Sequence, residues 1–489
     1  MQLHIYTEGD HSCGLGHIIR CMAYAEAWRA RGGQVIWWVD GDALAKSYLR
    51  VEQVHWGPWQ TQMSQAVSYP DAYALLDSYR AAQWMVERLA SGYGNIICLD
   101  DEYRLNYPQG FVVHGAPGET PANATGASWL CGPMWQPLRP AFWALPASRE
   151  PRESVQQILI IMGGTDVRRL LPVMVSWAQQ CFPAATLHAI VAAGGQDLPP
   201  EVICHHHLDD RQMAALMTKC DLAISAAGQT TFELLAARLP AVLVQVADNQ
   251  ASQMAAWHQL GVFISAGAWD APALQAAVFA ALSTLADKPA RQVCLDAMTH
   301  LSCGKGAPGL VGLVLGRRYL TQAVHTPHGT LVPFACLSRQ QSLRMLALRN
   351  DPRIAEQMMQ TRIITEEEHL AFVERQKSDL YNVNYALMDE QDQPLGMVAL
   401  QGIDWCARQA SLGIYKNVDL AVAGLGGRLM SALRHLAFQQ LQLASLSLGV
   451  KADNLRARAF YQKQGFTIIG PQTAPLLRMQ LSMNAVNAD

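Results

Sequence analysis

Short apolar runs alternate with helical patterns along the first part of the chain. Strands are predicted over residues 3–6, 34–40 and 95–99, and helices over residues 18–31 and 72–90. Strands that alternate with helices in this way favour a parallel sheet whose two faces are covered by helices.

The same alternation restarts after about residue 150, following a connecting stretch predicted over residues 146–153. Further strands, separated by helical segments, are predicted over residues 158–162, 186–192, 221–225, 241–247 and 261–265. The two sections predict a pair of α/β lobes of the Rossmann type, residues 1–150 and 151–322. In such sheets ligands bind beyond the carboxyl ends of the strands, so we expect one cleft between the lobes.

The order of elements changes in the last third of the chain. A stretch that contains Pro, Gly and Thr, residues 323–330, is interpreted as a linker to a third domain, residues 331–489. In that domain two helical segments come first, then three strands, a long helix, a strand and a second helix: 341–349 and 365–375, then 384–389, 394–400 and 410–415, then 423–441, 445–450 and 455–464. This order predicts a separate α/β domain.

Composition and charge narrow the functional classes. Half of the 489 residues are hydrophobic, 16% are charged and the net charge is −3, so neither a nucleic acid nor an anionic membrane is an expected partner. The eleven cysteines form no CxxC pair, which indicates reduced thiols. No signal-peptide pattern and no apolar run of membrane-spanning length are found. We therefore expect a cytoplasmic protein.

The strongest functional signal of the first lobe is the glycine-rich turn after its first strand. Gly14 and Gly16 allow a sharp turn close to a ligand, and the helix that follows offers free N–H groups to an anion. His17 lies at the start of that helix, and Arg20 lies one turn further on the same face. The pattern predicts substrate binding by this turn with a titratable imidazole beside it. A tight turn with a capping histidine is the alternative.

A similar turn follows a predicted strand of the second lobe. Gly228, Thr230 and Thr231 open a helix there, which suits a diphosphate group. Glu233, one turn into the helix, is expected to accept hydrogen bonds from ribose hydroxyls. An ordinary capped helix is the alternative interpretation.

Further substrate-binding residues are expected because they also follow predicted strands: Gly164, Asp100, and Asp248 with Asn249 and Gln250. Carboxylates and amides at strand ends can bind sugar hydroxyls, although such loops are common without a function. Two short segments contain side chains of the kinds that bind metals, the acidic residues 100–102 and the Cys-His-His-His residues 204–207. A single acidic cluster is weak evidence for a metal, and adjacent residues of an extended segment cannot all reach one ion. No metal is expected.

The third domain contains its own glycine-rich turn. Gly424, Gly426 and Gly427 open the long helix, which is typical of a phosphate-binding turn. Tyr461 lies near the end of the last helix, where a phenol can serve as an acid toward a leaving thiolate. A tyrosine packed between helix and sheet is the alternative.

Together with Asn454 and Gly465-Phe466, these residues resemble the GNAT N-acetyltransferases over about residues 331–481. The resemblance implies acetyl-CoA as the donor, with its pyrophosphate on the N–H groups of the three glycines. It also implies that Asn454 lies near the pantetheine arm and that Tyr461 protonates the departing thiolate. The family usually has Gln or Arg at the position that Ala421 occupies here.

The first two sections resemble the GT-B-fold UDP-sugar hydrolase of pseudaminic-acid biosynthesis, which is related to the MurG glycosyltransferases. The motifs that carry this resemblance occur in the family order: residues 14–21, 99–101, 132–139, 163–166, 228–233 and 247–250. It implies a UDP-sugar substrate, a catalytic base at His17, a ribose contact at Glu233 and a sugar-lining role for residues 248–250. The chain departs from the family near the expected site, with Tyr6 and Glu8 in place of Arg and Asp and with arginines after Asp166.

The resemblances together imply a fusion of two consecutive enzymes. Residues 348–352, with 364–365 and 368–369, look like the acetyltransferase of the same pathway, which would acetylate the 4-amino group of a UDP-sugar before UDP is removed. Three other interpretations stay open: a true glycosyltransferase, a non-catalytic nucleotide- or CoA-binding module, and a protein N-acetyltransferase.

Overall fold

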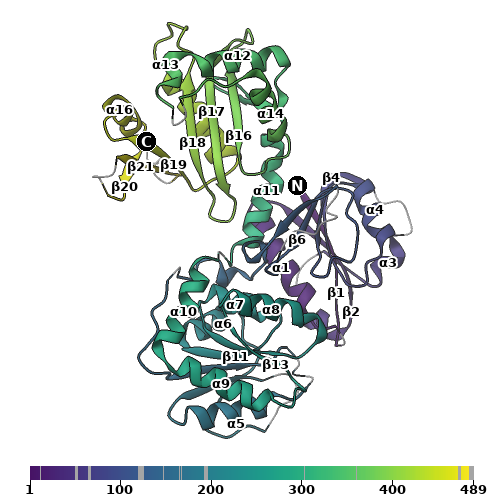
Figure 1. Cartoon of the computed structure of the whole chain (residues 1–489). Helices are drawn as coiled ribbons and strands as arrows, with labels where there is room; N and C mark the ends of the chain where they lie inside the picture. The colour runs from purple at the N-terminus through teal and green to yellow at the C-terminus, as the bar shows by residue number, and fades with distance from the viewer. Residues whose placement is uncertain are drawn as a thin grey trace. The chain divides into compact units, whose positions relative to one another are not determined.

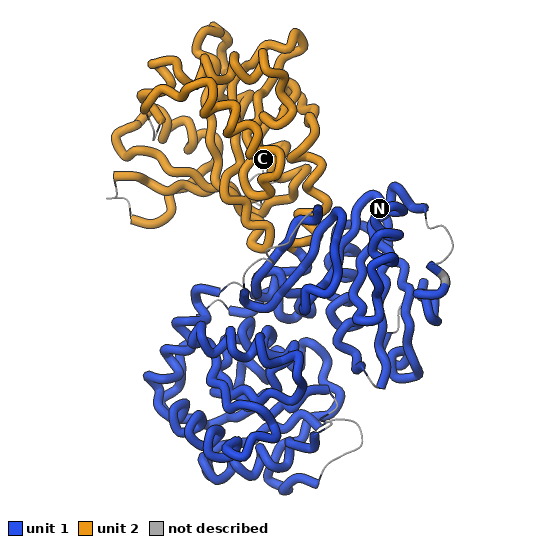
Figure 2. The backbone as a smooth tube through the Cα atoms, turned by 45° about the vertical axis from the view of Figure 1, so that its right-hand side comes forward, with its two compact units in different colours: residues 1–308 blue, residues 309–489 orange. Residues whose placement is uncertain are grey.

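The computed structural model divides the chain into two compact units, Met1–Pro308 and Gly309–Asp489, which are described separately (Figures 1 and 2). It describes residues 1–483 except residues 12, 50–52, 64–67, 119–125, 147, 165, 167, 192–196, 302, 359–360 and 472–474.

The first unit begins with a seven-stranded parallel sheet in the order β3-β2-β1-β4-β5-β6-β7. Its strands are β1 (Gln2–Gly9), β2 (Gln34–Gly41), β3 (Val54–Trp56), β4 (Tyr69–Asp77), β5 (Tyr93–Leu99), β6 (Phe111–His114) and β7 (Ser128–Cys131). The helices of this part are α1 (Gly16–Arg29), α2 (Ala43–Tyr48), α3 (Trp59–Gln62) and α4 (Gln83–Gly92). Because every ladder is parallel, the carboxyl ends of β1, β4 and β5 lie side by side at one edge.

A second parallel sheet follows in the order β10-β9-β8-β11-β12-β13. Its strands are β8 (Gln157–Ile161), β9 (Thr186–Ile190), β10 (Ile203–His205), β11 (Leu222–Ala226), β12 (Ala241–Gln245) and β13 (Ile264–Ala268). The helices are α5 (Leu171–Cys181), α6 (Asp210–Lys219), α7 (Thr230–Ala236), α8 (Ala251–Gln259), α9 (Leu274–Ala286) and α10 (Lys288–Thr299).

Side chains that alternate along the strands of this second sheet form two separate cores. Leu159 and Ile161 of β8 pack in one core with residues of α6, α7 and α8, whereas Ile158 and Ile160 pack in the other with residues of α5 and α9. Figure 1 shows these two helix sets on opposite sides of the sheet. This is the arrangement that continuous apolar strands require.

The second unit contains an eight-stranded mixed sheet in the order β14-β15-β16-β17-β18-β19-β21-β20. Its strands are β14 (Val324–Thr326), β15 (Gly329–Pro333), β16 (Val383–Met388), β17 (Pro394–Asp404), β18 (Gln409–Lys416), β19 (Ser445–Lys451), β20 (Thr467–Ile469) and β21 (Leu476–Ser482). The helices are α12 (Arg339–Asn350), α13 (Pro352–Ala355), α14 (Glu366–Gln376), α15 (Leu425–Arg434), a π-helix (His435–Gln440) and α16 (Leu455–Lys463).

The helix α11 (Gly306–Thr321) spans the division between the units. A Cβ at Gly309 would lie 2.5 Å from Sγ of Cys406, and one at Gly316 would lie 3.0 Å from the ring of Trp405. Near the end of the helix, the buried Tyr385 hydroxyl donates a hydrogen bond to the carbonyl of Tyr319, at 2.7 Å. From Gly309 onward, α11 therefore packs closely against the second unit.

Two predictions about secondary structure are wrong. Residues 72–90, expected to form one helix, contain the last part of β4 and then α4. Ala72, Ala74 and Leu76 are alternate residues of β4 that pack in one hydrophobic core, and β4 itself lies between β1 and β5 in the sheet. Central-strand packing overrides the helix propensity of Ala and Leu. Residues 323–330, expected to be a linker, instead contain β14 and the turn of the antiparallel β14–β15 hairpin.

A buried histidine makes the stability of the first unit depend on pH. Nδ1 of His4 and the hydroxyl of Tyr6 each lie 2.8 Å from the hydroxyl of Tyr93, and His4 is 2% exposed. Burial, together with the nearby His55, lowers the pKa of His4 to about 4. The folded chain therefore keeps His4 neutral while the unfolded chain binds a proton below about pH 6.5.

Because only the unfolded chain binds a proton at His4 in this range, we expect the free energy of unfolding to fall by about 2 kcal/mol between pH 7 and pH 5. The stabilisation is present above pH 6.5 and is lost as the pH falls toward 4. Urea unfolding at both pH values, compared between the native chain and His4→Gln, measures the effect. The same change at the exposed His300 is the control. Equal pH dependence in native chain and His4→Gln would contradict the prediction.

Candidate functional site

His17 and Asp77 meet at the carboxyl edge of the first sheet. Asp77 is the last residue of β4, next to β1, and His17 is the second residue of α1, which follows β1. Nδ1 of His17 lies 2.7 Å from Oδ1 of Asp77, and the residues are 5% and 1% exposed. Nη2 of Arg20 lies 3.1 Å from the same Nδ1, but the shorter contact is with the carboxylate, which only accepts hydrogen bonds. We therefore assign the proton to Nδ1, which leaves Nε2 as the basic nitrogen. The arrangement can place a proton acceptor at the sheet edge.

Arg20 holds the other side of the same carboxylate. Its Nε donates to Oδ2 of Asp77 at 3.0 Å and its Nη2 donates to Oδ1 at 2.7 Å, while its Nη1 binds the carboxylate of Asp101. Burial would raise the pKa of Asp77, but the Arg20 charge and the His17 hydrogen bond outweigh it, so the pKa is lowered. The guanidinium thus binds two aspartates, and its expected contact with substrate stays a prediction.

The glycine-rich turn leads into this cluster. The backbone of Gly14 exchanges two hydrogen bonds with that of Asp10, at 2.8 and 3.2 Å, which closes the loop before α1. Gly16 is exposed at the start of the helix. The ring of Tyr79 meets that of His17 edge to face, 4.6 Å between centroids. The turn therefore fixes where His17 enters the sheet edge.

Asp100, one of the expected substrate contacts, is used by its own turn. Its carboxylate accepts hydrogen bonds from the N–H groups of Glu102 and Arg104, at 2.9 and 3.0 Å, and from the Tyr107 hydroxyl at 2.8 Å. Asp100 therefore serves as the hydrogen-bonding acid of a turn at the end of a strand. The neighbouring Asp101, in contrast, joins the His17 cluster through Arg20.

The expected nucleotide residues of the second sheet follow three adjacent strands. Gly164 follows β8, Gly228 follows β11 and residues 248–250 follow β12, so their loops share one edge. Asp248 and Asn249 are exposed, whereas Oε1 of Gln250 accepts the N–H of Val246 at 3.0 Å. Thr165, which belongs to the motif of residues 163–166, lies outside the described residues.

Thr231 and Glu233 are buried and already have partners. The Thr231 hydroxyl donates to the carbonyl of Gly228 at 2.8 Å and accepts from Gln253 at 2.9 Å, which ties the turn to α8, while Thr230 is partly exposed. The guanidinium of Arg139 makes two hydrogen bonds to Oε1 of Glu233, at 3.1 and 2.8 Å. No hydrogen bond to Oε2 is found among the described residues, so the predicted ribose contact would use that oxygen.

The glycine-rich turn of the second unit begins α15. Gly424 is the residue before the helix, with the left-handed φ of 72° that favours glycine, and Gly426 and Gly427 lie in the first turn. The neighbouring strands β18 and β19 pair in parallel only over three residues each, Gln409–Ser411 with Ser445–Ser447. Beyond that point each strand pairs only on its other edge, with β17 or β21. An extended amide-containing arm could therefore bind along the facing edges.

Tyr461 and Asn454 both belong to α16. Asn454 caps the helix, because its Oδ1 accepts the N–H of Ala457 at 3.0 Å, which leaves its amide group for a ligand. Tyr461 is half-buried between Phe460 and Phe466. Burial raises the pKa of its phenol, so Tyr461 stays protonated at neutral pH. A protonated phenol is the form that an acid for a thiolate needs.

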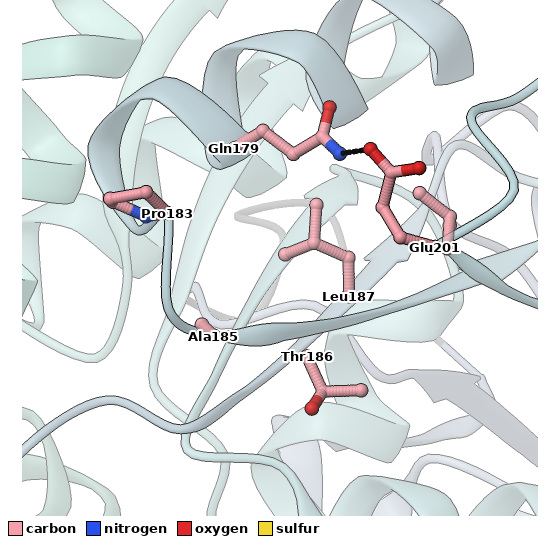
Figure 3. Close-up of a pocket in the computed structure, with 7 residues that line it drawn as sticks. Gln179, Pro183, Ala185, Thr186, Leu187 and Glu201 are labelled. Atoms are coloured by element: carbon pink, nitrogen blue, oxygen red, sulfur yellow. Dashed lines mark hydrogen bonds between the residues drawn. The ribbon is translucent and has the colours of Figure 1, made fainter.

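Two surface hollows lie apart from these residues. One, about 440 Å³, is lined by the end of α5, the start of β9 and Glu201, whose carboxylate accepts a 2.9 Å hydrogen bond from Gln179 (Figure 3). The other, about 540 Å³, lies at the π-helix and the β14–β15 turn and is lined by Arg408 and Arg434 among others. None of the predicted site residues lines either hollow.

In the described part of the chain, no group of three or more His, Cys, Asp or Glu side chains could hold a metal ion. No helix in that part is both long and apolar enough to cross a membrane.

Asp77 and Asp101 are the residues that sequence reasoning did not select for the site. Asp77 fell inside the segment wrongly expected to be helical, which concealed that it ends a strand next to β1. An apolar run closed by Asp-Ser, residues 72–78, was the available signal. Asp101 was weighed only as part of an acidic cluster, since its arginine partner is 81 residues away.

The C-terminal part of the chain matches a known protein family. Residues 347–466 match the model of the acetyltransferase (GNAT) family. Acetyltransferase PseH of Campylobacter jejuni serotype O:2 is 33% identical over 135 residues, which are 28% of this chain and 82% of that protein. PseH of serotype O:23/36 is 31% identical over the same length. The chain belongs to the acetyltransferase (GNAT) family through its C-terminal domain.

The N-terminal region is partly similar to a second protein. The Helicobacter pylori protein named "Pseudaminic acid cytidylyltransferase and UDP-2,4-diacetamido-2,4,6-trideoxy-beta-L-altropyranose hydrolase" is 29% identical over 108 residues. These residues are 22% of this chain and 20% of that protein. The predicted α/β class, with two Rossmann-like parallel sheets followed by a mixed GNAT-type sheet, is confirmed.

Solved structures with a similar fold cover about a third of the chain. The crystal structure of C. jejuni N-acetyltransferase PseH has 22% sequence identity and a TM-score of 0.26, and covers 31% of this chain and 96% of that one. Spermidine N-acetyltransferase from Vibrio cholerae, solved with CoA and spermine, has 19% identity and a TM-score of 0.29, and covers 34% and 97%.

Proposed function

We propose that the chain is a bifunctional nucleotide-sugar enzyme of pseudaminic-acid biosynthesis. Its second unit would transfer the acetyl group of acetyl-CoA to the 4-amino group of a UDP-4-amino-4,6-dideoxy sugar. Its first unit would then hydrolyse UDP-2,4-diacetamido-2,4,6-trideoxy-β-L-altropyranose to the free sugar and UDP. The names of the relatives of both regions support this pairing, because one relative is an acetyltransferase and the other hydrolyses a UDP-diacetamido sugar, the kind of product that acetyl transfer to an amino sugar would supply.

The single observation that carries the hydrolase proposal is the buried His17–Asp77 pair at the carboxyl edge of a parallel sheet. Nε2 of His17 would take a proton from water, and the water oxygen would attack the anomeric carbon. The bond between that carbon and the UDP oxygen would break, and attack opposite UDP would invert the anomeric centre. Gly228, Glu233 and residues 248–250 would hold UDP and the sugar.

In the acetyltransferase unit, acetyl-CoA would lie with its pyrophosphate at the α15 turn and its pantetheine arm along the facing edges of β18 and β19. The donor set fits: the turn presents backbone N–H groups, and both strand edges carry N–H and C=O groups without a strand partner between them. The sugar amine would attack the thioester carbon, and the C–S bond would break as Tyr461 gives its proton to the CoA sulfur. The proton that the nitrogen loses would pass to solvent, from which the phenol regains its own.

Incubation of the full chain with a UDP-2-acetamido-4-amino sugar and acetyl-CoA in ¹⁸O-labelled water tests both steps. Mass spectrometry should show an acetylated UDP-sugar first, and then free UDP and a sugar that carries one ¹⁸O. Label in UDP would contradict attack at carbon. Acetylation without any UDP release would limit the function to the acetyltransferase.

A glycosyltransferase is the second candidate, favoured by the GT-B-like pair of sheets that also suits sugar transfer. It differs in requiring an acceptor hydroxyl in place of water. Steady UDP release from the diacetamido sugar without any added acceptor would exclude it, whereas release only on addition of an acceptor would support it.

A further inference from the structure

The carboxyl edge of the first sheet holds an unequal set of buried charges around His17. The cation Arg20 contacts both Asp77 and Asp101. The charge of these aspartates raises the pKa of Arg20 well above its ordinary value despite its burial, and the pKa of Asp77 is lowered. Arg20 and Asp77 are therefore ionised at neutral pH, and with the carboxylate of Asp101 the cluster sets two carboxylates against one guanidinium, an excess of one negative charge.

The excess charge is not cancelled by the other groups around His17. Tyr79 meets the imidazole edge to face, and burial with nearby Asp101 raises the pKa of its phenol to about 12, so it is neutral. Arg104 lies over the ring of Tyr79, 5.5 Å from its centroid, and the charge of Glu102 helps to raise the pKa of the Tyr79 phenol. Cys21, also beside Asp77, has its pKa raised by burial and is a neutral thiol.

We propose that Asp77 and Asp101, linked by Arg20, are positioning residues that favour the protonated form of His17 during catalysis. Asp77 fixes the tautomer, since its Oδ1 accepts the Nδ1–H and leaves Nε2 as the proton acceptor. Asp101 supplies a second negative charge, without which the positive charge of Arg20 would cancel that of Asp77. When Nε2 takes the proton of water, the cluster passes from one negative charge to neutrality, and Asp77 itself keeps no proton.

The division of work between the two aspartates follows from their contacts. Without Asp101, Arg20 and Asp77 would neutralise each other, and the imidazolium would form as an uncompensated buried cation. Without Asp77, His17 would lose the carboxylate that contacts its Nδ1 in the described part of the chain, and its tautomer would no longer be fixed. The sequence motif alone assigns Arg20 to substrate, whereas this geometry assigns it to connecting His17 with a distant carboxylate.

The inference rests on the proposed hydrolase function for its kinetic consequence, but its titration can be measured without substrate. The full chain, labelled with ¹⁵N-histidine, is compared as native protein, Asp101→Asn and Asp77→Asn by NMR across pH. We expect native His17 to carry its neutral-state proton on Nδ1 and Asp101→Asn to lower its pKa by about one unit. Asp270→Asn, an exposed change in the same unit, should leave it unchanged.

Kinetics give the second readout on the same variants. Asp101→Asn should lower kcat for UDP release by about tenfold with KM little changed, and it should move the acidic limb of the kcat profile to lower pH by the shift seen in NMR. An unchanged His17 pKa in Asp101→Asn overturns the inference. The expected pKa shift with no UDP release from any UDP-sugar would instead refute the proposed hydrolase and leave the charge cluster established. Since Asp101 is partly exposed, its asparagine variant should fold, which circular dichroism checks.

Discussion

Replacing His17 with asparagine should reduce UDP release by about 10²–10⁴-fold, the range expected for loss of a general base. Asparagine can keep a hydrogen bond to Asp77 but offers no basic nitrogen toward water. The measurement is the rate of UDP formation from the diacetamido UDP-sugar at pH 7.5, with folding checked by circular dichroism.

The matched control for this variant is His300→Gln, which changes an exposed histidine of the same unit. Acetyl transfer by the second unit serves as an internal control, because His17→Asn alters no described contact of that unit. Near-native UDP release by His17→Asn would remove the histidine from the mechanism.

Replacing Tyr461 with phenylalanine should slow acetyl transfer by about 10²-fold, the lower end of the general-acid range, because a thiolate is already a good leaving group. The phenol is held protonated by burial, so its loss removes an acid and little packing volume. The measurement is CoA release from acetyl-CoA with the 4-amino UDP-sugar as acceptor.

Tyr381→Phe, at an exposed tyrosine of the same unit, is the comparison variant. UDP release from pre-acetylated sugar should be unaffected by Tyr461→Phe, which makes the two catalytic variants reciprocal controls. If CoA release stayed at the native rate, Tyr461 would be a packing residue, the alternative that its two phenylalanine neighbours suggest.

Sequence reasoning located β8 and β12 correctly because their apolar residues run without interruption, Ile-Leu-Ile-Ile in β8 and Ala-Val-Leu-Val in β12. The structure places both strands in the interior of a parallel sheet. β4 escaped because its core residues are alanine and leucine, which favour helices locally. The position of β4 between β1 and β5 depends on how the whole sheet assembles, so it cannot be predicted from the residues of β4 and their neighbours in sequence.

The same limitation governed the site. His17 and the glycines beside it form a local motif, and they could be selected without knowing the fold. The partners of His17 and Glu233 could not, since Asp77 is 60 residues from His17 and Arg139 is 94 residues from Glu233. Charge networks of this kind depend on which strands are neighbours, so a wrongly assigned strand removes a partner from view.

The packing of α11 bears on how the gene could be divided. A cut at the sequence-predicted boundary, between residues 322 and 323, would leave Trp405 and Cys406 of the acetyltransferase without the helix whose glycines press against them. A separately expressed acetyltransferase should therefore begin near Gly309 rather than at residue 323. A natural boundary between the two units should therefore fall upstream of α11, which assigns to the acetyltransferase domain a segment that the sequence pattern alone placed with the first unit.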